Sequence, residues 1–195
     1  YADADGPAGA FAQAAQALAG VRRLAVEARR MRVMELRLIQ QAFGAPGVDE
    51  AEPLFASLRM RKDPDELARM RAAVHIAERA LLNTLPNVRA GLTEREVASE
   101  LLVQTLRAGS DADLPFAPIV ASGPNGALPH ANITERRLQA GDLVTLDWGA
   151  AKDGYVADLT RTFALGEVYP ELKRIYDLAL AANAGVSVIR MMVES

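Results

Sequence analysis

The sequence contains no cysteine. Disulfides, cysteine-ligated zinc, iron–sulfur clusters and thiol nucleophiles are therefore excluded within this chain. An excess of positive charge is lacking too: the net charge is -3, so no general basic field favours nucleic acid as a partner. No apolar run reaches membrane-spanning length and no signal peptide is visible, so we expect no membrane partner and a cytoplasmic protein.

What is present is an ordinary globular composition, with 50% hydrophobic and 24% charged residues among 195. This length suits one domain or one and a half. The chain begins with Tyr1, and we expect that a natural N-terminus precedes it. An arginine-rich stretch between residues 22 and 37 is more typical of a solvated helical face than of a nucleic-acid site, because acidic residues follow it and no aromatics interleave.

The most informative segment runs from Gly141 to Gly166. Two runs of high β-propensity flank Lys152-Asp153-Gly154, a pattern that predicts a β-hairpin. Each run carries one aspartate in its middle, Asp147 and Asp158, although aspartate is unfavourable inside strands.

The register of this hairpin depends on its loop. A Lys152-Asp153 loop places Asp147 directly opposite Asp158, whereas an Asp153-Gly154 loop places Asp147 opposite Thr160 with Asp158 as a diagonal neighbour. Both registers put the two carboxylates on one face, and only an odd-residue bulged loop would separate them. The first strand's other face carries residues suited to a core: Val144, Leu146 and Trp148.

Two facing carboxylates repel each other unless a cation lies between them or one is protonated. One interpretation is a metal pair, since hard oxygen ligands suit Mn, Mg or Zn. The other is a solvated pair or an ion pair with Arg161 or Lys152. The hairpin by itself favours neither.

The remaining pattern is mostly helical at first and extended later. Asp63-Pro64-Asp65-Glu66 predicts a helix start, as does Thr93 with Glu96 in a capping box. We expect a single stripe of apolar residues on the first of these helices, formed by Leu67, Met70, Val74, Ala77 and Leu81. The expected helices cover residues 11–18, 31–43, 64–82, 94–107 and 171–190, and the expected strands cover 22–27 and 116–121; a single helix over 21–43 is the alternative at the start.

His130 is the second chemical candidate. It follows the Gly/Pro/Asn-rich turn at Ser122–Gly126, and loops of this kind often present functional side chains. Its imidazole could contact a substrate carbonyl or transfer a proton. A turn histidine without a chemical role is the alternative. His75, alone on a helix, is assigned no role.

Several motifs now stand in a fixed order: RMRKDPDEL, GLTERE, FAPIVASGPNGALPH, GDLVTLDWGA and GYVADLTRTFALG. Together they resemble the creatinase/prolidase/aminopeptidase P family of pita-bread metallopeptidases, in the prolidase or Xaa-Pro aminopeptidase branch. The resemblance implies an α+β pita-bread fold, here incomplete, with a curved antiparallel sheet covered by helices. Residues 1–58 are expected to be the tail of a smaller N-terminal domain, and residues 59–195 the first half of the catalytic domain.

The resemblance also implies roles. Asp147 and Asp158 match the first two metal ligands, and His130 matches a histidine that contacts substrate near the scissile bond. The implied function is an exopeptidase that cleaves Xaa-Pro bonds in proline-containing peptides with a water activated by two divalent ions, Mn first, Co or Zn otherwise. A homodimer is expected.

The family's other ligands, a histidine and two glutamates, lie further downstream and have no counterpart after Asp158. We therefore expect the chain to be part of a longer protein and to be inactive alone. A non-catalytic pita-bread module that binds peptides or proteins without a complete metal site is the alternative.

Overall fold

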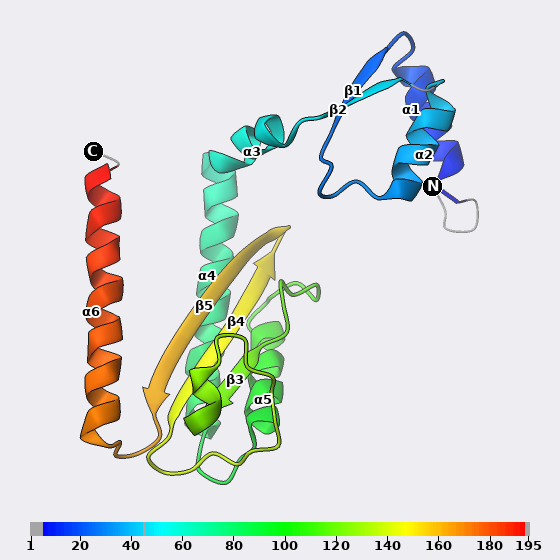
Figure 1. The fold of residues 1–195 in the computed structure, drawn as a ribbon. Helices are drawn as coiled ribbons and strands as arrows, with labels where there is room; N and C mark the ends of the chain where they lie inside the picture. Colours follow the sequence, from blue (N-terminus) through cyan, green and yellow to red (C-terminus); the bar gives the residue numbers. More distant parts are fainter. Residues whose placement is uncertain (1–5, 45, 194–195) are drawn as a thin grey trace. The chain divides into compact units, whose positions relative to one another are not determined.

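The structure is a computed structural model that describes residues 6–44 and 46–193, with side chains described as far as Asn183. It divides into two compact units, Tyr1–Asp63 and Pro64–Ser195. The helices α1 to α6 and strands β1 to β5 are labelled in Figure 1.

The first unit pairs two short parallel strands, β1 (Arg23–Val26) and β2 (Gly47–Glu50). Helix α1 (Ala8–Ala17) precedes them, α2 (Val33–Ala42) connects them, and α3 (Glu52–Met60) follows. Because β1 separates α1 from α2, the alternative of one helix over residues 21–43 is wrong.

Strand β2 and helix α3 have no counterpart among the elements expected from the sequence. The segment Gly47–Glu50 contains glycine and two acids and has little β-propensity of its own. It becomes a strand because it pairs with β1 along its whole length, and the Arg23–Asp49 ion pair links the two strands. Tertiary pairing therefore overrides local preference here.

The second unit is a three-stranded antiparallel sheet in the order β3 (Ile119–Ser122), β4 (Leu143–Lys152) and β5 (Tyr155–Ala164). Helices α4 (Pro64–Thr84) and α5 (Glu94–Arg107) precede the sheet, with the short helix η2 (Leu85–Asn87) after α4. A second short helix, η3 (Gly123–Ala127), follows β3, and α6 (Pro170–Val193) follows β5.

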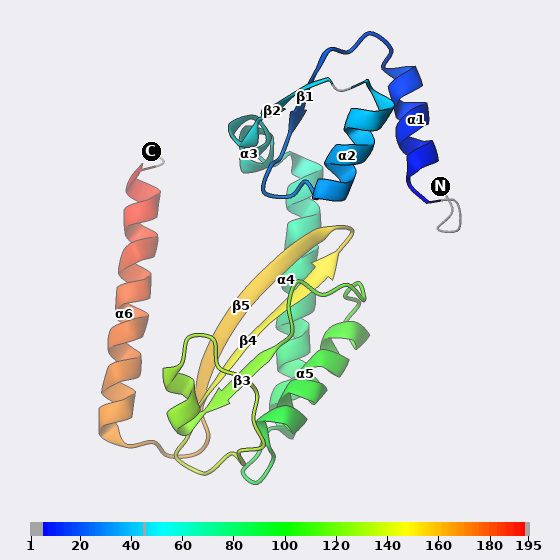
Figure 2. The ribbon, with the colours of Figure 1, turned by 45° about the vertical axis from the view of Figure 1, so that its right-hand side comes forward.

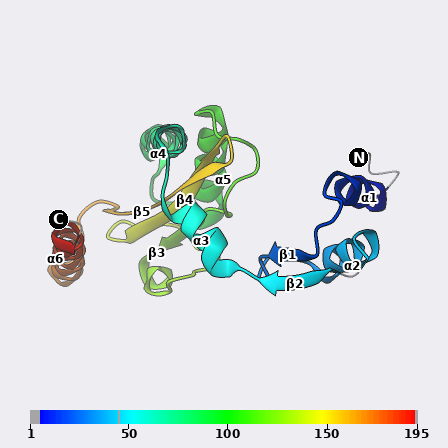
Figure 3. The ribbon, with the colours of Figure 1, turned by 90° about the horizontal axis from the view of Figure 1, so that it is seen from above.

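Helices α4 and α5 lie along the same face of this sheet, α4 against β4 and β5 and α5 against β3 (Figures 1 and 2). The view from above shows both helices on one side of the strands (Figure 3). Of the described helices, none combines the length and the apolar character that a membrane crossing requires.

The core lies between the helices and the sheet. As expected, Val144, Leu146 and Trp148 of β4 are fully buried. Helix α4 meets them with small residues, Ala73, Ala77 and Ala80, each fully buried. The Trp148 indole Nε1–H donates to the Ala77 carbonyl oxygen over 3.1 Å, which satisfies the one polar group of the buried ring.

The apolar stripe expected on α4 is therefore partly wrong. Leu67 is 41% exposed, whereas Ile76 and the alanines form most of the contact face, with Val74 and Leu81 at its margin. The large ring of Trp148 fills the space between helix and sheet, and small side chains on α4 allow the close approach. The bulk of the Trp148 side chain on β4 thus favours small residues on the side of α4 that faces it.

The expected helix starts are confirmed. Pro64 is the first residue of α4, and Thr93 and Glu96 form a reciprocal capping box at the start of α5. The Thr93 backbone N–H donates to Glu96 Oε2 over 2.7 Å, and the Glu96 N–H donates to Thr93 Oγ1 over 3.1 Å.

Candidate metal centre

The turn between β4 and β5 fixes the register of the hairpin. Asp153 and Gly154 both have positive φ angles, 50° and 81°. Two consecutive positive φ angles define the type I′ turn that matches strand twist, and Asp-Gly is a favoured pair for it. The loop is therefore Asp153-Gly154, and the Lys152-Asp153 alternative is wrong.

In this register Asp147 lies opposite Thr160, and Asp158 lies opposite Gly149. Because side chains alternate along a strand, Asp147 and Asp158 share the face of the sheet that α4 and α5 leave uncovered. Thr145 and Thr162 lie on the same face and hydrogen-bond through their hydroxyls over 2.9 Å. The middle of β4 thus alternates between polar residues on this face and buried apolar residues on the other.

Asp147 is half-buried and incompletely satisfied. Its Oδ1 atom is buried and has no hydrogen-bond partner among the described residues. Burial raises the pKa of Asp147 above its ordinary value and the charge of Asp158 adds to the increase, while hydrogen bonding to Thr160 and the charge of His130 oppose it. The Oδ1 atom of Asp147 is therefore a buried acceptor without a hydrogen-bond donor among the described residues.

The ion pairs considered from the sequence do not supply that partner. Lys152 Nζ lies 3.4 Å from Asp153 and 4.0 Å from Asp111, at the turn. The Arg161 guanidinium donates to the neighbouring Thr160 carbonyl oxygen over 2.8 Å. Within the described part of the chain, neither cation pairs with Asp147 or Asp158.

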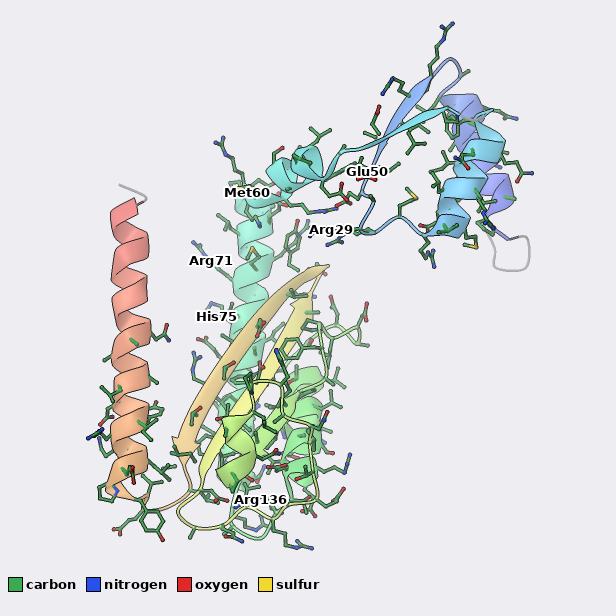
Figure 4. The ribbon with its side chains drawn as sticks, in the orientation of Figure 1. Arg29, Glu50, Met60, Arg71, His75 and Arg136 are labelled. Atoms are coloured by element: carbon green, nitrogen blue, oxygen red, sulfur yellow. The ribbon has the colours of Figure 1, made fainter. Side chains whose placement is uncertain are left out.

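His130 lies in the loop after η3, and its side chain is exposed. It is close enough to Asp147 for its positive charge to lower the pKa of that carboxyl. The structure therefore places Asp147 and Asp158 on one face of the sheet, and the charge of His130 acts on Asp147 from the loop after η3. His75, in contrast, lies on the exposed side of α4, 3.3 Å from Glu78, and takes no part (Figure 4).

A buried carboxylate for which the sequence gives no prediction lies at the start of α5. Glu94, the first residue of α5, is fully buried and accepts five hydrogen bonds of 2.6–3.0 Å. The donors are the backbone N–H and hydroxyl of Ser122, the amide of Asn125, and the backbone N–H and hydroxyl of Thr134. An acidic residue at a helix start is so common that no sequence signal distinguished this one.

An ion pair adjoins this network. Arg136 donates to both carboxylate oxygens of Asp142, over 2.6 and 2.9 Å, and to the Ser122 hydroxyl over 2.7 Å. Arg136 lies at the end of the second unit opposite the β4–β5 turn (Figure 4). Gly123, with φ +52°, runs so close that a Cβ atom there would lie 2.7 Å from both Arg136 and Asp142.

The two aspartates of the hairpin, Asp147 and Asp158, fit a divalent metal ion by their chemistry. Both offer hard carboxylate oxygens, and the unpartnered Oδ1 of Asp147 is an acceptor in need of a cation. Among the described residues, no group of three or more His, Cys, Asp or Glu side chains is arranged to hold a metal ion. The described chain therefore offers part of a ligand set.

Asp147 and Asp142 should respond in opposite ways to loss of their charge. For Asp142, burial raises the pKa, but the Arg136 and Gln139 hydrogen bonds outweigh burial, so the folded pKa lies below its ordinary value. Its contribution to stability is present above the ordinary pKa and is lost as the pH falls through the folded one. For Asp147, whose folded pKa is raised, ionisation destabilises the fold at neutral pH, and acid relieves this.

We therefore expect Asp147→Asn to stabilise the metal-free protein by about 1 kcal/mol at neutral pH. Asp142→Asn should destabilise it by about 2–3 kcal/mol, because Arg136 loses its charged partner. Urea unfolding with a chelator present measures both, and both differences should shrink near about pH 3. Destabilisation by both variants at neutral pH would contradict the distinction between the two aspartates.

The chain is similar to known peptidases in sequence and in fold. The family model for metallopeptidase family M24 matches residues 68–194. A peptidase of Bacillus subtilis, YqhT, whose function is uncharacterised, is 39% identical over 134 residues, which cover 68% of this chain and 38% of that protein. The Xaa-Pro dipeptidase of Pyrococcus furiosus is 34% identical over 133 residues, with the same coverage.

Solved structures show the same fold. The X-Pro aminopeptidase of Thermotoga maritima superimposes with a TM-score of 0.80 at 32% identity, over 90% of this chain and 49% of that one. The prolidase of Pyrococcus horikoshii gives 0.79 at 27% identity, over 90% of this chain and 50% of that one.

The helices and antiparallel sheet are thus part of a pita-bread α+β fold, as expected. The chain belongs to metallopeptidase family M24. It spans about half the length, or less, of the relatives that it matches.

Proposed function

We propose that the whole protein is a metal-dependent exopeptidase that cleaves Xaa-Pro bonds. The observation that carries this proposal is the pair Asp147 and Asp158 on the open face of the hairpin, with a buried oxygen of Asp147 lacking any partner among the described residues. Membership of a metallopeptidase family supports it, as do relatives named Xaa-Pro dipeptidase and X-Pro aminopeptidase.

In this proposal Asp147 and Asp158 are metal ligands for two divalent ions, Mn first and Co or Zn otherwise. Bound ions of this kind lower the pKa of a coordinated water and polarise the scissile carbonyl. Further ligands must come from outside the described residues, since two carboxylates do not complete a site.

The chain's own residues have defined tasks. Thr160 lies opposite Asp147 in the β4–β5 pairing, and in this proposal its hydroxyl holds that carboxylate in place beside the ions. His130, on the neighbouring loop, donates a hydrogen bond from its imidazole to the substrate near the scissile bond. A proline-containing peptide is the substrate class, and a homodimeric state and a cytoplasmic location stay predictions.

The proposal is tested with the whole protein and, separately, with the 195-residue chain. We expect the whole protein with Mn²⁺ to hydrolyse an Xaa-Pro dipeptide or an Xaa-Pro-initiated tripeptide, to lose activity with a chelator and to regain it with added Mn²⁺. The chain alone should bind Mn²⁺ weakly and show no turnover, because its ligand set is partial.

Two outcomes would contradict the proposal. Absence of heat in a calorimetric Mn²⁺ titration of the whole protein would favour a non-catalytic binding module. Mn²⁺ binding with cleavage of peptides regardless of proline would retain the metallopeptidase but remove the Xaa-Pro specificity. Comparing dipeptides with longer peptides would then separate a dipeptidase from an aminopeptidase.

A further inference from the structure

The loop that carries His130 is held at both ends by one carboxylate. This loop, residues 122–134, leaves β3 at Ser122 and ends at Thr134. Glu94 Oε1 accepts from the Ser122 N–H and hydroxyl, each over 2.8 Å. Glu94 Oε2 accepts from the Thr134 N–H over 3.0 Å, the Thr134 hydroxyl over 2.6 Å and the Asn125 amide over 2.9 Å.

Each oxygen of Glu94 therefore binds one end of the loop. The Asn125 amide also donates to the Asn132 carbonyl oxygen over 3.2 Å, which links the outgoing and returning segments of the loop. In the sequence His130 lies between Asn125 and Asn132, and its side chain is exposed. Because its side chain is exposed, its position depends on how firmly the loop ends are fixed.

The chemistry of the five donors requires a carboxylate. Two of them are backbone N–H groups, one on each oxygen, and a backbone N–H cannot act as an acceptor. A glutamine in this place would direct its NH₂ group at one of these N–H groups, whichever way the amide turned. A buried donor would then be left unpaired at one end of the loop.

Helix capping does not explain this arrangement. The first turn of α5 is capped by Thr93 and Glu96, whose side chains satisfy each other's backbone N–H groups. The carboxylate of Glu94 instead binds side chains and backbone groups from 28 to 40 residues away in the sequence. Complete burial of a carboxylate is costly unless such bonds compensate it.

We propose that Glu94 is a positioning residue, which fixes both ends of the 122–134 loop and thereby sets where His130 meets the substrate. This inference rests on the proposed function for the role of His130. The anchoring of the loop by Glu94 is independent of that function, and the two can be tested apart.

The experiment uses the whole protein loaded with Mn²⁺ and an Xaa-Pro dipeptide. The variants are Glu94→Gln, His130→Ala, their combination, and Glu96→Gln as a matched control on the same helical turn. We expect Glu94→Gln to lower kcat/KM roughly 30- to 100-fold, since small misplacement of a group that contacts the substrate has effects of this size. Glu96→Gln should lower it less than about 3-fold, because the Glu96 side chain hydrogen-bonds to Thr93 at the helix start and not to the 122–134 loop within the described residues.

The combined variant distinguishes positioning from general damage. If Glu94 acts through His130, the combined variant should lose no more activity than His130→Ala alone, within about 3-fold. The Mn²⁺ affinity from calorimetry should be unchanged in Glu94→Gln. Multiplying losses in the combined variant, or a loss equal to that of Glu96→Gln, would overturn the positioning role.

Hydrogen exchange of the loop amides tests whether Glu94 anchors the loop, and this test does not depend on peptidase activity. Exchange over residues 123–133 should be faster in Glu94→Gln than in Glu96→Gln, and equal exchange would overturn the inference. If the wild-type protein does not cleave Xaa-Pro peptides, the proposed function fails, and this exchange comparison alone judges whether Glu94 holds the loop.

Milder variants cover the case in which Glu94→Gln does not fold. Asn125→Ala and Thr134→Val each remove one side-chain donor and leave the backbone N–H bonds to Glu94 in place. Each should lower kcat/KM roughly 3- to 10-fold and lose that effect in the His130→Ala background. Independent losses in that background would count against positioning.

Discussion

Replacing Asp158 by asparagine is expected to lower kcat/KM of the whole protein for an Xaa-Pro dipeptide by roughly 10³-fold or more. Asparagine keeps the size of the side chain but removes the negative charge that the proposed divalent ion requires beside Asp147. Transition-state stabilisation by bound metal contributes several kcal/mol, and each 1.36 kcal/mol corresponds to about tenfold in rate. Calorimetric Mn²⁺ titration should show a matching loss of affinity.

Asp153→Asn is the matched control. Asp153 belongs to the same hairpin and loses the same charge, but it lies at the turn with a positive φ angle that asparagine also adopts readily. We expect this control to keep Mn²⁺ affinity and kcat/KM within about 3-fold of wild type. Equal losses in the two variants would show that general hairpin charge, rather than a ligand at Asp158, supports activity.

The hairpin could be predicted from the sequence because its signals are local. Asp153-Gly154 specifies a turn whose two positive φ angles few other residue pairs tolerate, and alternation then places every side chain on a known face. Once the turn is fixed, Asp147 and Asp158 have to share a face. The core positions Val144, Leu146 and Trp148 follow from the same alternation.

What the sequence could not indicate depends on contacts between distant segments. Strand β2 has weak β-propensity and exists because β1 pairs with it. Glu94 resembles any acidic residue in a first helical turn, and its five donors come from residues that the sequence places well downstream. Nothing local indicates that α4 buries Ala73 and Ala80 in preference to Leu67, because burial depends on the sheet residues that each turn of α4 faces.

Gly149 is a further residue whose importance only the structure reveals. It lies on β4 directly opposite Asp158, where most strand residues would improve β-propensity. A Cβ atom built there would lie 2.4 Å from the Ala157 carbonyl oxygen and 2.5 Å from Pro115 Cγ. The first contact is with backbone of the paired strand, which cannot move away without disturbing the β4–β5 pairing beside Asp158.

We therefore expect Gly149→Ala to destabilise the protein by about 3 kcal/mol, at the upper end of the usual range for overpacking. Gly126→Ala is the control, because a Cβ atom at that position meets only the Ala121 carbonyl oxygen at 3.9 Å, an ordinary contact, and its change should stay within about 0.5 kcal/mol. Urea unfolding measures both variants.

The effect of Gly149→Ala should extend to the proposed metal ligands. Since Gly149 and Asp158 form one cross-strand pair, any shift that relieves the overlap with Ala157 displaces Asp158 relative to Asp147. Mn²⁺ affinity of the whole protein should therefore fall in Gly149→Ala and stay unchanged in Gly126→Ala. A stable Gly149→Ala protein with wild-type Mn²⁺ affinity would show that the sheet accommodates the methyl group, and that the glycine is not required for the spacing of the two aspartates.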